Sequence, residues 1–265
     1  MRLFTVDSFT NVPFKGNPAA VCVLEKPLTV QQYIDIAQEM NLSETGFVYE
    51  ENGSYQLRWF TPTQEIELCG HATLATAKIL FDKYKVEKEV LEFHTLSGVL
   101  TVKQKGELLE MDFPLGHTKA ISSKDDILEA FLGEKPKAVE ANNGWCLVEV
   151  SHSDVVKKLN PQFSLLLKHS KNKFIITAKS TDTAYDFVSR MFAPDFGIDE
   201  DPVTGSTHCY LANYWSQKLS KNIIVGYQAS KRGGVVACEI AGNNRVLLRG
   251  DCVIMAELLV EWDLN

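Results

Sequence analysis

Hydrophobic residues in the first part of the chain follow two spacings. Short apolar runs between turn-forming residues predict strands at 2–9, 19–24, 45–50, 55–60, 91–95, 99–103 and 108–113. Apolar residues three or four positions apart predict helices at 29–40 and 70–81. Thr29 and Gln32 have the spacing of a capping box at the start of the first helix. The expected apolar face of that helix consists of Tyr33, Ile34, Ala37 and Met40.

A polar segment at 114–126 separates this pattern from a second one and is a candidate linker. The second pattern predicts helices at 127–132, 154–159, 163–168 and 205–219. It predicts strands around 139 and at 146–150, 174–178, 184–192, 223–227, 235–240, 245–248 and 253–262. We therefore expect two domains, 1–115 and 116–265. The last strand is too apolar for an exposed edge, and its packing with the first half is an open alternative.

The two halves resemble each other. Arg58 and the four residues after it match Arg190 and its followers at a shift of 132 residues. An acidic loop follows each strand and ends at a glycine that begins a helix, Gly70 or Gly205, at a shift of 135. This common order of strand, proline, acidic loop, glycine and apolar helix indicates a duplication. Chance resemblance of two strand–loop–helix segments is the alternative.

The duplication also predicts the architecture. Each half has many strands and one helix that is apolar nearly all round, which is typical of a buried helix. We predict an α+β fold of two similar halves, each a β-barrel-like sheet wrapped round a central helix. The active site of a duplicated fold is expected in the cleft between the halves.

Composition excludes several classes of function. The 27 basic and 34 acidic residues give a net charge of −7, which argues against a nucleic-acid partner. We find no apolar run long enough to cross a bilayer and no secretory signal, so we expect a cytoplasmic protein without a membrane partner. Six scattered cysteines without a CxxC pair are expected to be reduced thiols, mostly in the core.

The repeated loops are the first candidate binding elements. Gly70 and Gly205 each begin a helix, where free backbone N–H groups and the helix dipole attract a carboxylate. Glycines that only allow close helix packing are the alternative. Because the feature occurs twice, we favour a ligand.

Several side chains near these loops can move protons. Glu44 precedes an apolar strand, where partial desolvation would raise its pKa; an exposed loop carboxylate is the alternative. His71 lies in the first turn of a helix, where the positive field favours neutral imidazole; a purely structural histidine is equally consistent.

Three further residues have two interpretations each. Asp201 is an anionic partner or the first residue of an Asp-Pro turn. Ser206, which matches His71 in the repeat, binds a ligand or caps its helix. Cys69 is a thiol of lowered pKa at a helix start or an inert buried thiol, and we prefer the latter because the matching residue is Thr204.

Other motifs are absent from the sequence. We find no P-loop, GxGxxG after a strand, HExxH, GxSxG or clustered His/Cys set. The sequence therefore favours acid/base chemistry without a metal or cofactor.

Four motifs in order resemble the PhzF-like (phenazine-biosynthesis) isomerase family, which is related to diaminopimelate epimerase. These motifs are 7–10 with 16–21, 42–45, 69–75 and 200–206. The resemblance covers essentially the whole chain and implies a diaminopimelate epimerase-like fold. It also implies a homodimer.

The resemblance also implies roles at the site. The family's activity moves a proton between ring carbons of a cyclic dihydro-hydroxy acid, with no metal or cofactor. Glu44 would carry the proton, with His71 and Asp201 assisting it. The residues expected to bind the small carboxylate substrate are Asn17, Gly70, Gly205 and Ser206.

Two departures from the pattern keep other functions open. The epimerase relatives use two opposed cysteines, whereas here Cys69 is matched by Thr204. An epimerase or racemase that uses Cys69 with another partner is therefore the alternative enzyme. The loop that contains Arg232 resembles the family loop only loosely, so the substrate transfers less well than the fold. A non-catalytic protein that binds small anions is the third hypothesis.

Overall fold

The computed structural model describes residues 1–122, 126–142, 144–168 and 172–260. Its residues form two compact units. Unit 1 comprises Met1–Asp112 and Arg249–Asn265, and unit 2 comprises Phe113–Leu248. Among the described residues, no helix is both long enough and apolar enough to span a membrane. All six cysteines are buried and none forms a disulfide.

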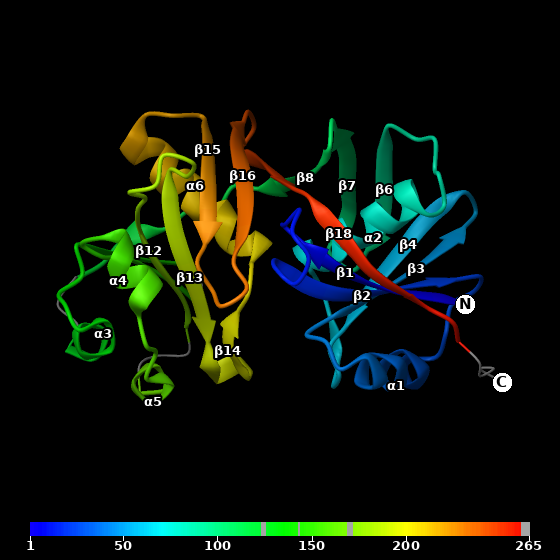
Figure 1. Cartoon of the computed structure of the whole chain (residues 1–265), viewed down its shortest axis with the longest axis horizontal. Coiled ribbons are helices and arrows are strands. Elements are labelled where there is room, and N and C mark those ends of the chain that lie inside the picture. The colour runs from blue at the N-terminus through cyan, green and yellow to red at the C-terminus, as the bar shows by residue number, and fades with distance from the viewer. Residues whose placement is uncertain (123–125, 143, 169–171, 261–265) are drawn as a thin grey trace. The chain divides into compact units, whose positions relative to one another are not determined.

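Unit 1 surrounds one helix with strands (Figure 1). The strands are β1 (Arg2–Ser8), β2 (Asn17–Leu24), β3 (Thr45–Glu51), β4 (Ser54–Phe60), β5 (Glu65–Ile66), β6 (Val90–Thr95), β7 (Gly98–Lys105), β8 (Leu108–Pro114) and β18 (Cys252–Leu258). The order of paired strands is β18–β1–β2–β3–β4–β6–β7–β8, with β2–β3 and β4–β6 parallel and the other pairs antiparallel. The C-terminal strand thus completes the sheet of the N-terminal unit.

Unit 2 repeats this order. Its strands are β9 (Lys119–Ala120), β10 (Ala138–Asn142), β11 (Trp145–Glu149), β12 (Lys173–Lys179), β13 (Phe187–Ala193), β14 (Ile198–Asp201), β15 (Ile223–Gln228), β16 (Gly234–Ala241) and β17 (Arg245–Gly250). The pairing is β9–β10–β11–β12–β13–β15–β16. As in unit 1, the third and fifth pairs in this order, β11–β12 and β13–β15, are parallel, and the other pairs are antiparallel. The pairing confirms the predicted duplication and the two similar halves.

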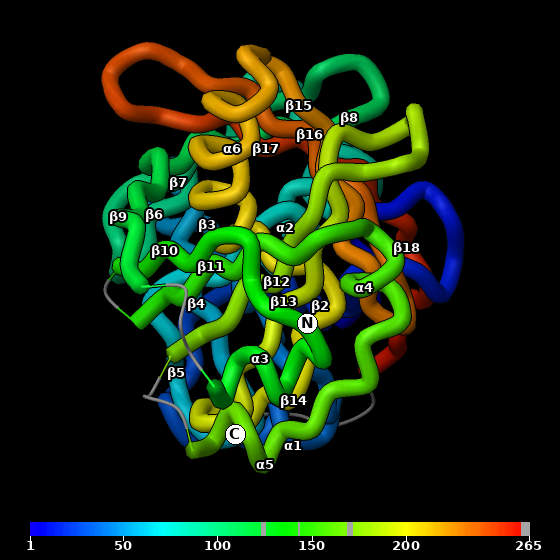
Figure 2. Tube along the Cα trace, turned by 90° about the vertical axis from the view of Figure 1, so that its left-hand side faces the viewer, coloured from blue at the N-terminus to red at the C-terminus, as the bar shows by residue number. Residues whose placement is uncertain are grey.

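Each unit contains a central helix. In α2 (Gly70–Asp82), ten of the thirteen residues are buried, and the helix packs on β1, β2, β3 and β18. Its small residues allow close approach: a Cβ on Gly46 of β3 would lie 2.9 Å from the Thr76 hydroxyl. In unit 2, α6 (Gly205–Leu219) packs on β15 and β16, as Figure 2 shows. The predicted buried helices are therefore confirmed.

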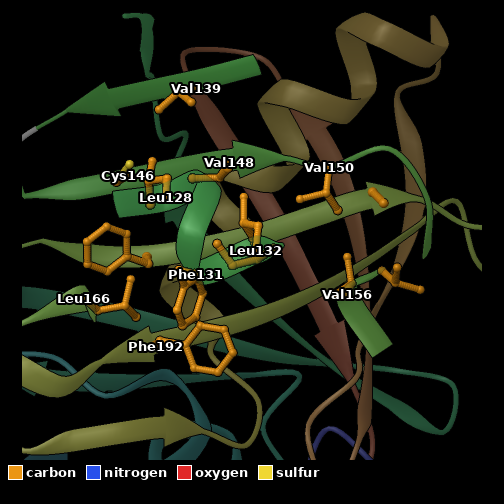
Figure 3. Packing of buried hydrophobic residues seen from close by; sticks show 14 residues of the cluster. Leu128, Phe131, Leu132, Val139, Cys146, Val148, Val150, Val156, Leu166 and Phe192 are labelled. Carbon is orange, nitrogen blue, oxygen red and sulfur yellow. The ribbon is translucent and has the colours of Figure 1, made fainter. Parts of the chain in front are cut away.

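The remaining helices cover the strands. Helix α1 (Val30–Met40) begins at the predicted capping box, and buries Tyr33, Ile36 and Ala37. Ile34 and Met40, expected on the apolar face, are only half-buried. Unit 2 has α3 (Asp126–Leu132), α4 (Ser153–Lys158), α5 (Phe163–Leu166) and the 3-10 helix η1 (Pro194–Phe196). Leu128, Phe131 and Leu166 from α3 and α5 pack on the strands in a single apolar cluster (Figure 3).

The structure differs from the prediction in four places, besides shifts of one or two residues at the ends of other elements. The strand expected at 184–192 begins at Phe187, because the Asp182 carboxylate accepts from the Ala184 N–H and forms a turn. The strand expected at 253–262 ends at Leu258, and its last two positions lie outside the described residues. The polar segment at 114–126 contains β9; residues 123–125 of it are outside the described part. The acidic loops contain the short strands β5 and β14.

A matched pair of arginines closes the repeated loops. Arg58 of β4 donates two hydrogen bonds to the Glu65 carboxylate, at 2.7 and 2.6 Å. Arg190 of β13 makes the same two bonds to Glu200, at 2.7 and 2.8 Å. The second loop is three residues longer, and η1 accommodates the additional length. The same ion pair therefore closes the equivalent loop in each half of the duplication.

The turn between β1 and β2 provides a stability test. Gly16 has a φ of +67°, and a Cβ there would lie 2.1 Å from the Ser8 carbonyl oxygen. Gly53 has a φ of +79° with no atom within 4 Å of such a Cβ. We expect Gly53→Ala to lower the free energy of unfolding by roughly 1–2 kcal/mol from backbone conformation alone. Overpacking should add roughly 1–3 kcal/mol in Gly16→Ala.

Urea unfolding followed by tryptophan fluorescence measures both variants. Equal losses for Gly16→Ala and Gly53→Ala would contradict a tightly packed β1–β2 turn.

Candidate functional site

Unit 1 brings Glu44 and His71 into direct contact. Glu44 lies between α1 and β3, where its backbone carbonyl accepts from the Ala20 N–H of β2. His71 is the second residue of α2. The His71 Nε2 lies 3.3 Å from the Glu44 Oε2, and their side chains are 7% and 12% exposed. The pair is almost buried, and its carboxylate keeps limited access to solvent.

The other ring nitrogen of His71, Nδ1, contacts two more residues that the sequence had singled out as candidates. The Asn17 Nδ2 lies 3.3 Å from the His71 Nδ1, and the Cys69 Sγ lies 3.5 Å from the same atom. The Ser8 hydroxyl donates to the His71 carbonyl at 2.8 Å and anchors the backbone. Both ring nitrogens therefore have polar neighbours, which restricts rotation of the imidazole.

The charges of this cluster are coupled. Burial alone would raise the pKa of Glu44, but the hydrogen bond and charge of His71 outweigh burial and lower it. Burial alone would lower the pKa of His71, but its contacts with Cys69 and Glu44 raise it well above 6.5. Burial raises the pKa of the Cys69 thiol. The Glu44 carboxylate faces the His71 Nε2, and the Cys69 sulfur faces the Nδ1.

Two predictions about protonation are wrong. We expected burial to raise the pKa of Glu44 and the helix N-terminus to keep His71 neutral. The structure instead pairs the two groups, and a nearby opposite charge favours the ionised form of each. Glu44 is also not an exposed loop carboxylate.

Glu44, Cys69 and His71 form a group that could hold a metal ion, with ligand atoms within 4.8 Å of one another. The Cys69 Sγ lies 4.0 Å from the His71 Nε2. In a tetrahedral zinc site, sulfur and nitrogen ligands are about 3.6 Å apart. The Cys69 sulfur is at about this separation from the His71 Nδ1, at 3.5 Å, and is farther from the Nε2.

Unit 2 gathers a second set of polar groups before α6. The Thr204 hydroxyl donates to the Asp201 carboxylate. The buried Gln228 side chain at the end of β15 bonds to both residues through three hydrogen bonds. Gly205 begins α6 and is buried, and Ser206 follows it half-buried, with no hydrogen bond from its hydroxyl among the described residues.

The predicted site residues thus form one set in each unit. Asn17, Glu44 and His71 are in contact in unit 1, and Gly70 directly precedes His71 at the start of α2. Asp201, Gly205 and Ser206 lie along one six-residue segment of unit 2. Arg232 lies half-buried in the loop between β15 and β16.

The sequence analysis missed two serines that bind the loops before α2 and α6. Ser97 lies two residues after β6, and its hydroxyl donates to the Glu67 carbonyl at 2.7 Å. Ser230 lies two residues after β15 and donates to the Pro202 carbonyl at 2.8 Å. Each acceptor lies three residues before the glycine that begins a central helix. Extending the repeat past the helices would have revealed this pair.

The comparisons with known proteins agree on one family. The family described as "Phenazine biosynthesis-like protein" matches residues 6–258. An "Uncharacterized isomerase" of Halalkalibacterium halodurans is 46% identical, with 97% of this chain and 98% of the relative covered. A crystal structure of a "phenazine biosynthesis protein PhzF family" member from Enterococcus faecalis has a TM-score of 0.92 at 42% identity, with 97% of each chain covered.

A more distant structure shows the breadth of the fold. A "probable proline racemase" from Agrobacterium radiobacter has a TM-score of 0.61 at 12% identity, over 99% of this chain and 93% of the other. This likeness concerns the fold alone, which is the predicted epimerase-like one. With its fold, its repeated helices and its near-complete match, the chain belongs to the phenazine biosynthesis-like protein family.

Proposed function

We propose that the protein is an isomerase that moves a proton between carbon atoms of a small carboxylate-bearing substrate, with Glu44 as the acid/base group. The contact between Glu44 and His71 carries this proposal. Relatives named as isomerases, such as the one from Halalkalibacterium halodurans, support the reaction class. A cyclic dihydro-hydroxy acid is the substrate class we propose.

The reaction needs Glu44 in two protonation states, and the contact with His71 supports both. Glu44 as carboxylate takes a proton from one carbon. The carboxylic acid exchanges its proton with solvent, and it then delivers a proton to another carbon. His71 as imidazolium donates a hydrogen bond to the carboxylate and stabilises it before and after the transfer. The proton count is unchanged over the cycle, so no oxidant or reductant is needed. A positioned acid/base group of this kind contributes about 10²–10⁴-fold in rate.

The remaining residues complete the proposal. We assign Asn17, whose Nδ2 lies 3.3 Å from the His71 Nδ1, to substrate binding. We assign Asp201 to assist proton transfer, and Gly70, Gly205 and Ser206 to bind the substrate. Cys69 has less support as a catalytic thiol, because burial raises its pKa and the matching Thr204 hydroxyl is hydrogen-bonded to Asp201. Formation of a homodimer stays a prediction.

Replacing Glu44 tests the proposed acid/base role. In D₂O, the wild type should exchange deuterium into dihydro-hydroxy-anthranilic acid or another member of a panel of cyclic and amino carboxylates, as followed by NMR. Glu44→Gln should lower this exchange by about 10²–10⁴-fold. Its melting temperature should fall only modestly, because His71 can release its proton once the carboxylate is gone.

Glu50→Gln is the control, since Glu50 is an exposed glutamate at the far end of β3. Undiminished exchange in Glu44→Gln would refute the proposed role. Binding of a panel member without any exchange by the wild type would favour the anion-binding function instead. Exchange at the Cα of an amino acid that disappears in Cys69→Ala would favour the epimerase alternative.

Histidine NMR tests the protonation of the pair. The pKa of His71, raised by its contacts, should keep the imidazole charged well above pH 6.5, and Glu44→Gln should lower that midpoint. His208, whose pKa burial lowers to about 4, is a buried control that should stay neutral at pH 6.5 in both proteins. A wild-type midpoint for His71 at or below 6.5 would contradict the charged pair.

The same shifts predict how stability depends on pH. The lowered pKa of Glu44 gives a contribution that is complete above its ordinary 4.5 and is lost as the pH falls through the folded value. The raised pKa of His71 gives a contribution that is complete below 6.5 and is lost as the pH rises through the folded value. The stability advantage of wild type over Glu44→Gln should therefore be largest between about pH 4.5 and 6.5 in urea unfolding. An advantage that grows steadily above pH 6.5 would contradict this sign.

A further inference from the structure

The Gln228 side chain reaches from the end of β15 to the loop before α6. It is fully buried. Its Oε1 accepts from the Thr204 N–H at 2.9 Å, and its Nε2 donates to the Asp201 carbonyl at 2.7 Å. An N–H can only donate and a carbonyl can only accept, so these two partners determine the orientation of the amide.

This orientation determines the direction of the next hydrogen bond. The Gln228 Nε2 also donates to the Thr204 Oγ1 at 3.2 Å. The Thr204 hydroxyl thereby accepts one bond and directs its own proton elsewhere. Its acceptor is the Asp201 Oδ2. Gln228, Thr204 and Asp201 form a directional chain of donors that ends on a carboxylate.

The hydrogen bonds that connect Gln228, Thr204 and Asp201 also leave the first turn of α6 without a side-chain cap. Threonine at an N-cap usually accepts a hydrogen bond from the first turn of its helix, but Thr204 makes no such bond. The hydroxyl of Thr207 donates back to the Thr204 carbonyl and does not cap the turn either. The Ser206 hydroxyl has no hydrogen bond among the described residues, as noted above. The N–H groups of the first turn therefore donate no hydrogen bond to the Thr204 side chain.

Comparison of the two units shows that this device is particular to unit 2. The serine hydrogen bonds of Ser97 and Ser230 occur in both units and belong to the shared scaffold. Gln228 ends β15 as Thr95 ends β6, but the Thr95 hydroxyl donates to Gly98 within its own turn. The reach of Gln228 to the loop before α6 is an addition to the repeat.

We propose that Gln228 is a positioning residue, which acts through Thr204 to orient the Asp201 carboxylate and to keep the first turn of α6 uncapped for a substrate anion. This inference rests on the proposed function for its kinetic consequence. The positioning of Thr204 and Asp201 by Gln228 is inferred from the hydrogen bonds alone. Gln228 itself need not touch the substrate.

Variants of Gln228 and Thr204 test the series of hydrogen bonds that ends on Asp201. The probe is dihydro-hydroxy-anthranilic acid, or the panel member that the wild type exchanges in D₂O. Thr204→Val and Gln228→Met should each lower kcat for exchange about 10–100-fold with a smaller change in KM, and Thr204→Ser should restore at least half of the wild-type kcat. The double variant should be no slower than the slower single variant, because both act through one carboxylate.

Thr177→Val is the matched structural control. Thr177 is also a buried threonine of unit 2, and its hydroxyl bonds to the Val188 carbonyl and the Trp215 indole. It should lower the melting temperature and leave kcat within twofold of wild type. Additive losses in the double variant, or equal kcat in Thr204→Ser and Thr204→Val, would overturn the proposal.

Amide hydrogen exchange separates this inference from the proposed function. In the free protein, the Thr204 N–H should exchange slowly in wild type and Thr204→Val, where the Gln228 Oε1 still accepts from it, and at least tenfold faster in Gln228→Met. Unaltered protection in Gln228→Met would overturn the positioning role, whatever the activity. Protection as expected, with no exchange into any carboxylate by the wild type, would support the geometry and refute the proposed function.

Discussion

A bidentate ion pair between an arginine and a glutamate closes the loop before each central helix. Arg58 and Arg190 project from equivalent strands, and each binds a carboxylate on the short strand that follows. Both pairs are partly buried, and removing one partner of such a pair leaves a charge without compensation, at a cost of roughly 3–5 kcal/mol when burial is complete. The loop ends, and with them Gly70 and Gly205, are placed by this interaction. The hydroxyls of Ser97 and Ser230 donate to backbone carbonyls of the same loops.

The duplicated scaffold carries two different sets of polar groups. Unit 1 places an acid and a base in contact, because its central helix begins with Gly70 and His71. At the equivalent place unit 2 has Gly205 and Ser206 and adds a buried glutamine. In a duplicated protein, equivalent backbone positions can carry different side chains, so one half can perform acid/base chemistry and the other can bind the ligand. β9 begins 133 residues before β18, and it pairs with β10 in unit 2 as β18 pairs with β1 in unit 1.

The sequence predicted most of the fold, because the signals involved are local. Capping at Thr29, the apolar surface of α2 and the spacing between Arg58 and Gly70 each depend on residues within about a dozen positions. Strand ends were less accurate where a side chain made a turn, as Asp182 does. The candidate residues Glu44 and His71 were found through their motifs. Their meeting in space was not visible, because 27 positions separate them.

By itself, the sequence determined which segments form strands and helices, that they occur twice, and which titratable groups lie near the repeated glycines. Hydrophobic periodicity and repeat spacing are properties of the chain, so they can be read without coordinates. Only the tertiary structure decided the directions in which the pKa values of Glu44 and His71 shift, because a pKa depends on charges in contact and these come from different elements. It alone revealed the hydrogen bond of Gln228 to the Thr204 N–H, which lies 24 residues earlier in the chain. Long-range hydrogen bonds leave no periodic trace, so folding has to bring their partners together before they can be recognised.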